Sequence, residues 1–232
     1  MKTNSIVLAG ILAISTLTSC DAQKNGKAKL TSQIDSVSYA IGADIGKNLK
    51  RSNLENVNLE VMMSAMKDAF KNDSLMLTDQ QCQDIVTGYL QQQQNKKQSE
   101  NVEKGKKFLQ ENAKKEGVTQ LASGLQYSVI KMGTGPKPST TDVVKTHYHG
   151  TLINGKVFDS SVDRGEPAVF PVNGVIKGWT EALQLMPVGS KWKLFIPSDL
   201  AYGERGAGGD IGPGETLVFE VELLSIEAAP KE

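Results

Sequence analysis

The hydrophobic positions of this chain recur with a helical period in the amino-terminal half and with a period of two after about Leu121. The first helical stripe repeats every fourth residue: Val37, Ile41, Ile45 and Leu49. A second helix is expected to begin after Asn58, a favourable N-cap. Its apolar positions lie three and four residues apart: Leu59, Met62, Met63, Met66, Ala69 and Phe70. The pattern therefore predicts a helical segment followed by a β-rich one.

The helical segment, residues 33–77, is too short to bury much apolar surface on its own. Four of the seven methionines of the chain fall in it, at Met62, Met63, Met66 and Met76, and methionine adapts to irregular contact surfaces. Gly42 and Gly46 would also let a second helix approach closely, although two glycines at this spacing can arise by chance. We therefore expect a homodimer in which a second copy completes the core. A plain core within one chain is the alternative.

A third helix is expected after Thr78, which forms a capping box with Gln81. The polar sequence continues to Gly117, a favourable C-cap, and residues 91–101 contain no apolar residue. A coiled coil needs apolar a and d positions, so residues 78–117 are predicted to form a single solvated connecting helix. Gly88 and Gly105 are the places where it could bend. A flexible linker is the alternative.

The β-rich half, residues 118–232, alternates apolar and polar residues in several short runs. The clearest apolar positions are Leu125, Tyr127 and Val129, then Trp192, Leu194 and Ile196, then Leu217, Phe219, Val221 and Leu223. Asn154-Gly155 between two such runs is a strong hairpin signal, and only residues 179–185 look helical. The predicted fold class is α+β: an all-α dimerisation region, a long connecting helix, and an antiparallel sheet wrapped around a short helix.

The first 19 residues have the pattern of a signal peptide. A basic start precedes an apolar stretch from Ile6 to Leu17, which is too short to span a bilayer. The stretch ends in Leu17-Thr18-Ser19-Cys20, which resembles a bacterial lipobox, so Cys20 is the expected lipidation site and residues 20–32 the tether. Lipid on Cys20 would anchor the protein in the bacterial cell envelope, on the periplasmic side or at the outer membrane. An ordinary cleaved signal peptide is the alternative.

The chain has two cysteines. If Cys20 carries lipid, Cys82 has no partner within the chain. We therefore expect Cys82 to be a buried helix residue, with a disulfide to its twin across a dimer axis as the alternative.

Composition excludes several classes of function. The formal net charge is zero, whereas a general nucleic-acid binder normally carries a basic excess. His147 and His149, the two histidines of the chain, share one face of a predicted strand, opposite Tyr148, but no third metal ligand accompanies them. The aromatic runs between Tyr148 and Phe219 include no Ser/His/Asp set and no Cys/His pair. The chemistry is therefore expected to need neither metal nor cofactor and to use an apolar pocket.

Residues 121–226 resemble an FK506-binding-protein (FKBP) type peptidyl-prolyl isomerase domain. The resemblance is carried by five runs, which are residues 147–150 (HYHG), 158–161 (FDSS), 175–179 (VIKGW), 201–203 (AYG) and 216–219 (TLVF). In the amino-terminal half, residues 38–46 (SYAIGADIG), the long polar helix and residues 123–127 (SGLQY) resemble the macrophage infectivity potentiator (Mip) and FkpA branch. The resemblance covers nearly all of the chain after residue 20.

The resemblance implies the site residues. Trp179 would form the pocket floor, and the backbone N–H of Ile176 and the hydroxyl of Tyr202 would hold substrate carbonyls. Asp159 would lie near the rotating bond, held by neighbours. It is the site residue least explicable as ordinary core, because a buried carboxylate is costly unless paired. Phe158 completes the expected catalytic set. The expected substrate-binding residues are Tyr148, Phe170, Val175, Ile176, Ile211 and Phe219.

The resemblance also implies an activity. The cis and trans forms of an X-Pro bond differ by only about 0.5–1 kcal/mol but interconvert slowly, and a pocket of this kind would accelerate their exchange. The expected partners are proline-containing unfolded or nascent envelope polypeptides, with FK506- or rapamycin-like macrolides as further ligands. Ala207-Gly208 replaces the histidine-proline pair of the small cytosolic members, which predicts a more mobile loop over the pocket. A dimeric chaperone clamp with incidental isomerase activity, or an adaptor that docks a proline-containing partner, are the alternatives.

Overall fold

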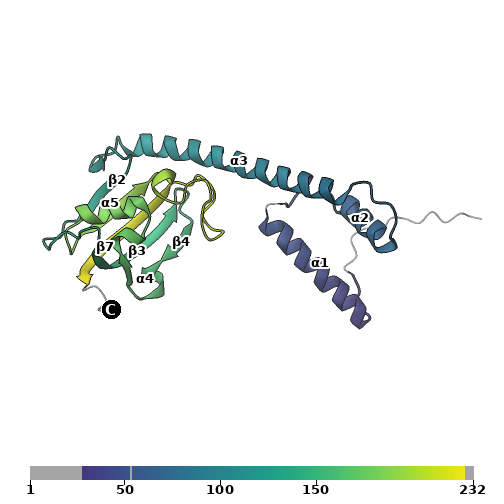
Figure 1. Cartoon of the computed structure of the whole chain (residues 1–232). Coiled ribbons are helices and arrows are strands. Elements are labelled where there is room, and N and C mark those ends of the chain that lie inside the picture. The colour runs from purple at the N-terminus through teal and green to yellow at the C-terminus, as the bar shows by residue number, and fades with distance from the viewer. Residues whose placement is uncertain (1–27, 53, 228–232) are drawn as a thin grey trace, which may run out of the picture. The chain divides into compact units, whose positions relative to one another are not determined.

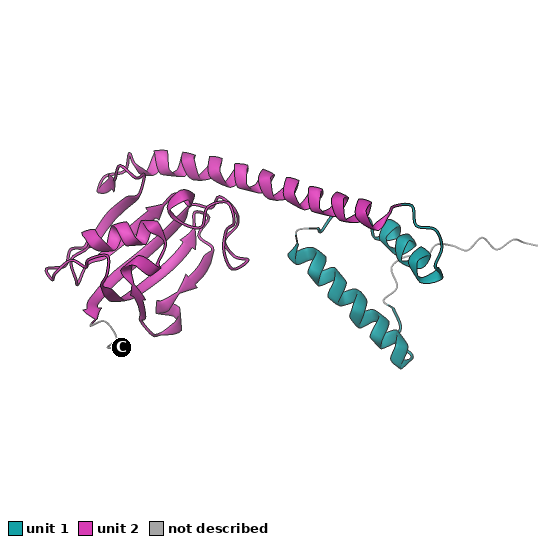
Figure 2. Ribbon diagram, in the orientation of Figure 1, with its two compact units in different colours: residues 1–76 teal, residues 77–232 magenta. Residues whose placement is uncertain are grey.

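The computed structural model describes residues 28–52 and 54–227. The chain divides into two compact units, residues 1–76 and 77–232, shown separately coloured in Figure 2. The predicted signal peptide, Cys20 and the first part of the tether lie outside the described residues. Within the described residues, no helix is both long enough and apolar enough to cross a membrane.

The first unit contains α1 (Gln33–Arg51) and α2 (Leu59–Lys71). The N-cap prediction at Asn58 is confirmed, because its side chain accepts from the backbone N–H groups of Glu60 and Val61 at 3.0 and 3.2 Å. Among the described residues of this unit, none in α1 or α2 is buried. The apolar residues of both helices are exposed or half-buried in the single chain, so the described part of this unit has no core of buried residues.

The second unit begins with α3 (Asp79–Asn112), the long helix labelled in Figure 1. The capping box of Thr78 and Gln81 is confirmed, and the flexible-linker alternative is wrong. The helix ends before Gly117, however, and that glycine has a φ of +77° in the turn that leads into the first strand. Cys82 lies on α3 as predicted, but it is exposed in this chain rather than buried.

The second half of α3 packs against the sheet, so the prediction of a fully solvated helix is wrong there. Its residues Asn101, Gly105 and Asn112 are buried. A Cβ atom on Gly105 would lie only 2.3 Å from the hydroxyl oxygen of Thr216, so this glycine permits close packing. Asn112 donates to the side-chain oxygen of Gln126 at 2.9 Å. This buried amide pair joins the helix end to the sheet.

Seven antiparallel strands form one sheet, in the order β1-β2-β6-β7-β3-β4, with β5 also paired to β3. Their bounds are β1 Val118–Gln120, β2 Gln126–Lys131, β3 Val143–Leu152, β4 Val157–Ser160, β5 Ala168–Pro171, β6 Lys191–Ile196 and β7 Leu217–Glu227. The hairpin predicted at Asn154-Gly155 joins β3 to β4. Gly155 has a positive φ of +85° but Asn154 does not, so the connection is longer than a two-residue type I′ turn.

The helix predicted over residues 179–185 is α5 (Lys177–Leu185), which lies against the sheet in Figure 1. It contributes Trp179, Ala182 and Leu183 to a core that includes Leu194 of β6 and Leu223 of β7. The structure adds a one-turn helix, α4 (Ser161–Arg164), and the 3₁₀ turns η1 (Val172–Gly174) and η2 (Ser198–Leu200). The expectation of a single helix in this half was therefore wrong, because one turn is too short to show a period.

Candidate active site

A cavity of about 580 Å³ opens between α5, the sheet and the loop that precedes β7. It is lined by Tyr148, Phe158, Asp159, Phe170, Gly174, Val175, Ile176, Trp179, Tyr202, Ala207, Gly208, Asp210, Ile211 and Phe219. The structure thus brings together all ten residues that the sequence predicted for the pocket. It adds Ala207 and Gly208, from the loop that the resemblance placed over the pocket, and also Gly174 and Asp210, which the sequence did not distinguish.

Trp179 lies at the centre of the aromatic lining. Its ring meets those of Tyr148 and Phe219 nearly at right angles, with centroids 5.4 and 5.3 Å away, and that of Phe170 at 6.0 Å. Such edge-to-face pairs add stability beyond the area that they bury. Phe158 makes a further edge-to-face pair with Phe219 at 5.4 Å. The walls and floor are therefore held in one arrangement before any substrate enters.

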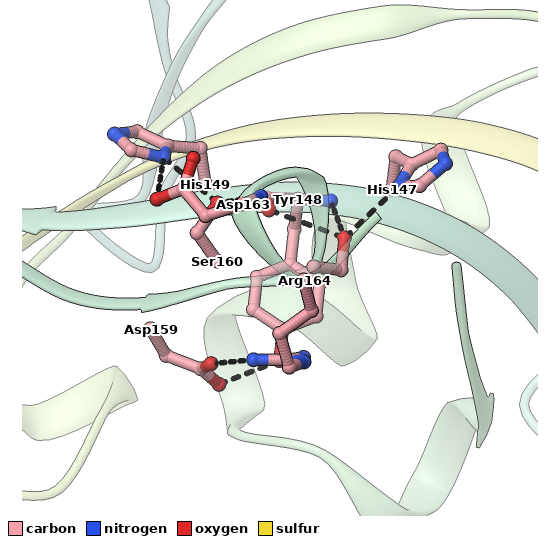
Figure 3. A network of polar contacts seen from close by, with 8 residues as sticks. His147, Tyr148, His149, Asp159, Ser160, Asp163 and Arg164 are labelled. Atoms are coloured by element: carbon pink, nitrogen blue, oxygen red, sulfur yellow. Dashed lines mark hydrogen bonds and ion pairs between the residues drawn. The ribbon is translucent and has the colours of Figure 1, made fainter. Parts of the chain in front are cut away.

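Asp159 is held by two donors, as Figure 3 shows. The hydroxyl of Tyr148 donates to its Oδ2 at 2.5 Å, and Arg164 pairs with its Oδ1. Arg164 also donates to the Tyr148 oxygen at 2.9 Å. The prediction that neighbours hold Asp159 is borne out by these contacts. Its side chain is 44% exposed, so Asp159 is not a core residue.

The sequence reasoning missed Arg164, although a signal was available. A carboxylate expected to be paired calls for a cation nearby, and Arg164 follows Asp159 by five residues. Arg164 is the last residue of α4, which is capped by the hydroxyl of Ser160. The fully buried Ser161 ties the same turn to β3, because its hydroxyl accepts from the backbone N–H of Tyr148 at 2.7 Å. The turn thus positions both partners of Asp159.

These contacts set the ionisation of Asp159. Partial burial would raise the pKa of its carboxyl, but the hydrogen bonds from Tyr148 and Arg164 and the charge of Arg164 outweigh it, so the pKa lies below its ordinary value. A lowered pKa means that the folded state favours the ionised form. Asp159 therefore stabilises the fold above the unfolded-state pKa of about 3.9, and this contribution is lost as the pH falls through the folded-state pKa.

We accordingly predict how the stability difference between the wild type and Asp159→Asn depends on pH. The difference in melting temperature should be constant between about pH 5 and pH 8 and should shrink below about pH 4, because only there does the wild-type carboxyl take up its proton. Thermal unfolding followed by circular dichroism measures it. A difference that changes between pH 5 and pH 8 would contradict the lowered pKa.

Two polar groups at the cavity are free to bind a substrate. Among the described residues, neither the backbone N–H of Ile176, just before α5, nor the hydroxyl of Tyr202 makes a hydrogen bond. Burial and the charge of Asp159 raise the pKa of Tyr202, so its hydroxyl keeps its proton at neutral pH and can donate. Ile176 and Tyr202 both line the cavity, and the resemblance implies these two groups as donors to substrate carbonyls.

The loop over the cavity has a defined shape. Ala207 and Ile211 exchange backbone hydrogen bonds of 2.9 and 3.0 Å, and Gly206, Gly208 and Gly209 have positive φ angles. Lys156 of the β3–β4 hairpin pairs with Asp210 at 2.9 Å. The glycines form the turn before Ile211, and the side chain of Ile211 lines the cavity.

The histidines face away from the cavity, as predicted. Tyr148 is buried, whereas His147 and His149 are half-buried on the opposite side of β3. Their Nδ1 atoms lie 3.1 and 3.0 Å from the hydroxyls of Ser161 and Ser160. In the part of the chain that the structure describes, no group of three or more His, Cys, Asp or Glu side chains is arranged to hold a metal ion.

A sheet wrapped around one helix, with a tryptophan-floored aromatic cavity, defines a class of prolyl isomerase, and comparison with known families agrees. The family model "FKBP-type peptidyl-prolyl cis-trans isomerase" matches residues 134–224, and the model "Domain amino terminal to FKBP-type peptidyl-prolyl isomerase" matches residues 34–129. The chain belongs to the FKBP-type peptidyl-prolyl cis-trans isomerases, in the group that carries this amino-terminal domain.

Individual relatives share most of the chain. "Outer membrane protein MIP" of Legionella longbeachae is 44% identical over 99% of both chains. The "FKBP-type 22 kDa peptidyl-prolyl cis-trans isomerase" of Escherichia coli (strain K12) is 50% identical over 82% of this chain and 93% of its own. Among solved structures, FkpA from Escherichia coli matches with a TM-score of 0.67 at 37% identity, over 86% of this chain and 99% of that one. The expectation of a Mip- and FkpA-like isomerase is thus confirmed.

Proposed function

We propose that the cavity floored by Trp179 takes up a proline ring and accelerates X-Pro isomerisation during the folding of bacterial envelope proteins. The observation that carries this proposal is the closed set of aromatic contacts around Trp179, next to two unpaired donors. The substrates are proline-containing unfolded or nascent polypeptides. Names of relatives such as "Outer membrane protein MIP" support an envelope location.

The mechanism breaks no covalent bond. Resonance keeps the amide planar, with a barrier of about 18–20 kcal/mol, and the planar amide is more polar than the twisted one. An apolar cavity from which water is excluded therefore favours the twisted transition state relative to water. The N–H of Ile176 and the hydroxyl of Tyr202 hold the carbonyls on either side of the bond, so that the rotation is confined to the proline amide. The carboxylate of Asp159 lies near the rotating bond.

The proposed roles are tested by Asp159→Asn and Tyr202→Phe in an isomerisation assay on a short X-Pro peptide. Loss of one hydrogen-bonding or charged group that acts in the transition state should lower kcat/KM by about ten-fold, equivalent to about 1.4 kcal/mol. The fold should be retained, since both side chains are partly exposed. Asp163→Asn, which removes a carboxylate of α4 outside the cavity lining, is the matched control. Unchanged activity in Asp159→Asn would make that residue structural.

The amino-terminal helices form the interface of a homodimer. The support is the exposed apolar surface of α1 and α2, which includes Ile41, Met63 and Phe70, and the match of residues 34–129 to the family's amino-terminal domain.

The family assignment favours catalysis over a chaperone clamp as the principal activity. FK506- or rapamycin-like macrolides are ligands of the same cavity.

Cys20 carries the lipid anchor. The lipobox-like residues 17–20 support this proposal, and two or more acyl chains on one residue bind a membrane stably. Replacing Cys20 with serine should move the mature-sized protein from the membrane fraction to the soluble envelope fraction and abolish labelling by a radioactive fatty acid. Cys82→Ser, the matched control, should leave both unchanged. Label that persists in Cys20→Ser would show that the lipobox interpretation is wrong.

A further inference from the structure

The charged groups that line the cavity are all negative. Of the described residues in the lining, only Asp159 and Asp210 carry charge. Their cationic partners, Arg164 and Lys156, do not belong to the lining. Other charged residues follow lining residues in the sequence, namely Lys177, Glu204 and Arg205, but none of them lines the cavity. The charge carried by the lining residues themselves is therefore negative, and each of the two carboxylates is paired with a cation outside the lining.

The two carboxylates are held very differently. Asp159 has two donors, Tyr148 and Arg164, and this network leaves it little freedom to change partners. Asp210 has one, the ammonium of Lys156 at 2.9 Å. The two side chains of that pair are 57% and 53% exposed. Exposed ion pairs of this kind contribute little stability, and lysine holds its charge on a flexible stem. The carboxylate of Asp210 can therefore exchange Lys156 for a cation on a bound peptide.

The position of Asp210 is fixed even though its side chain is exposed. The next residue, Ile211, is 8% exposed and exchanges two backbone hydrogen bonds with Ala207. The loop therefore presents the Asp210 carboxylate at the mouth of the cavity, directly beside an apolar side chain that enters it. Asp210 has no role in the isomerisation step described above. Its carboxylate is therefore available to pair with the side chain of a substrate residue next to the proline.

We propose that Asp210 is a specificity-determining residue that favours substrates with lysine or arginine next to the proline and disfavours those with glutamate or aspartate there. The proposal rests on the proposed function of the cavity as a proline site. A cationic side chain flanking the proline displaces Lys156 and pairs with Asp210, whereas an acidic side chain meets the negative charge of both lining carboxylates. The aromatic lining binds the proline ring, and this contact does not depend on the charge of the flanking residue.

The test compares two peptide series by exchange NMR, which needs no coupling protease. One series varies the residue before the proline and the other the residue after it, each with lysine, glutamine or glutamate. The measured quantity is the ratio of kcat/KM for lysine over glutamate peptides. For the full-length protein this ratio should be about two- to five-fold higher than for Asp210→Asn in at least one series, the effect expected for an exposed charge pair. Salt at about 1 M should remove most of the difference.

Two further variants sharpen the result. Lys156→Gln should raise the ratio above that of the wild type, because Asp210 then has no competing partner. Glu204→Gln removes a negative charge from the same loop outside the cavity lining and should leave the ratio unchanged. A ratio that is the same in wild type and Asp210→Asn in both series, or that falls equally in Glu204→Gln, would overturn the proposal. No turnover of the glutamine peptides by the folded wild type would instead overturn the proposed function, and this inference with it.

Discussion

Trp179→Ala is expected to reduce isomerase activity on a short X-Pro peptide by more than about ten-fold, which corresponds to more than about 1.4 kcal/mol of transition-state stabilisation. Trp179 makes edge-to-face contacts with Tyr148, Phe170 and Phe219. Its removal therefore takes away the floor and also the contact that orients three walls. Activity should be measured by the rate of cis-to-trans conversion at a temperature at which the variant is folded.

The same substitution costs stability, so a control is needed. Truncation of a buried aromatic residue typically costs about 3–5 kcal/mol, and Trp179 is 4% exposed. Trp192 is a matched control, because it is 3% exposed and stacks on Tyr127 at 4.3 Å but does not line the cavity. Trp192→Ala should lower the melting temperature comparably and keep its activity while folded. Full activity in folded Trp179→Ala would refute the proposed pocket.

Charge placed on the apolar faces of α1 and α2 is expected to convert a dimer into a monomer. In the double variant Ile41→Glu and Phe70→Glu, two carboxylates would have to be buried without partners in each half of the interface, which is costly. Phe70 is 85% exposed in the single chain, so the substitution should leave the monomer folded. Sedimentation at micromolar concentration should show dimeric wild type and monomeric variant.

The control for this experiment is Lys67→Glu, an exposed position of α2 outside its apolar spacing, which should stay dimeric. A monomeric wild type would contradict the dimer. A fragment adds a second test: residues 77–232 should be monomeric and active on short peptides, and residues 21–117 should self-associate. The isomerase fragment begins at residue 77 so that it keeps α3. A fragment that began at residue 118 would lack Asn112, the buried hydrogen-bond partner of Gln126.

Local signals in the sequence predicted most of the elements. The caps at Asn58 and Thr78 and the hairpin at Asn154-Gly155 are confirmed because each depends on residues within four positions of one another. Alternation predicted the central strands for a similar reason, since a half-buried strand has a fixed period of two. The ten predicted lining residues came from resemblance to a family, and their gathering around one cavity agrees with it.

Features that depend on distant partners could not be predicted. At the end of α3, Asn112 makes a buried hydrogen bond to Gln126 on β2. The role of Gly105 depends on Thr216, more than a hundred residues away in the chain. Cys82 was expected to be buried on compositional grounds, yet the first half of α3 leaves it exposed. Asparagine, glycine and cysteine each occur at both buried and exposed helix positions, so the residue type alone did not fix the environment.

By itself, the sequence determined the α+β class, the starts of α2 and α3, the hairpin and the aromatic set of an FKBP-type site, because these follow from short-range periodicity, capping and recognisable runs. Only the tertiary structure decided that Arg164 on α4 holds Asp159 and Tyr148, and that Lys156 reaches Asp210 at the mouth of the cavity. These pairs involve exposed, flexible cations, and a chain offers many of them. Arg164 lies only five residues from Asp159 and could be suggested from the sequence, but which cation meets which carboxylate is set by the packing of strands and loops around the core.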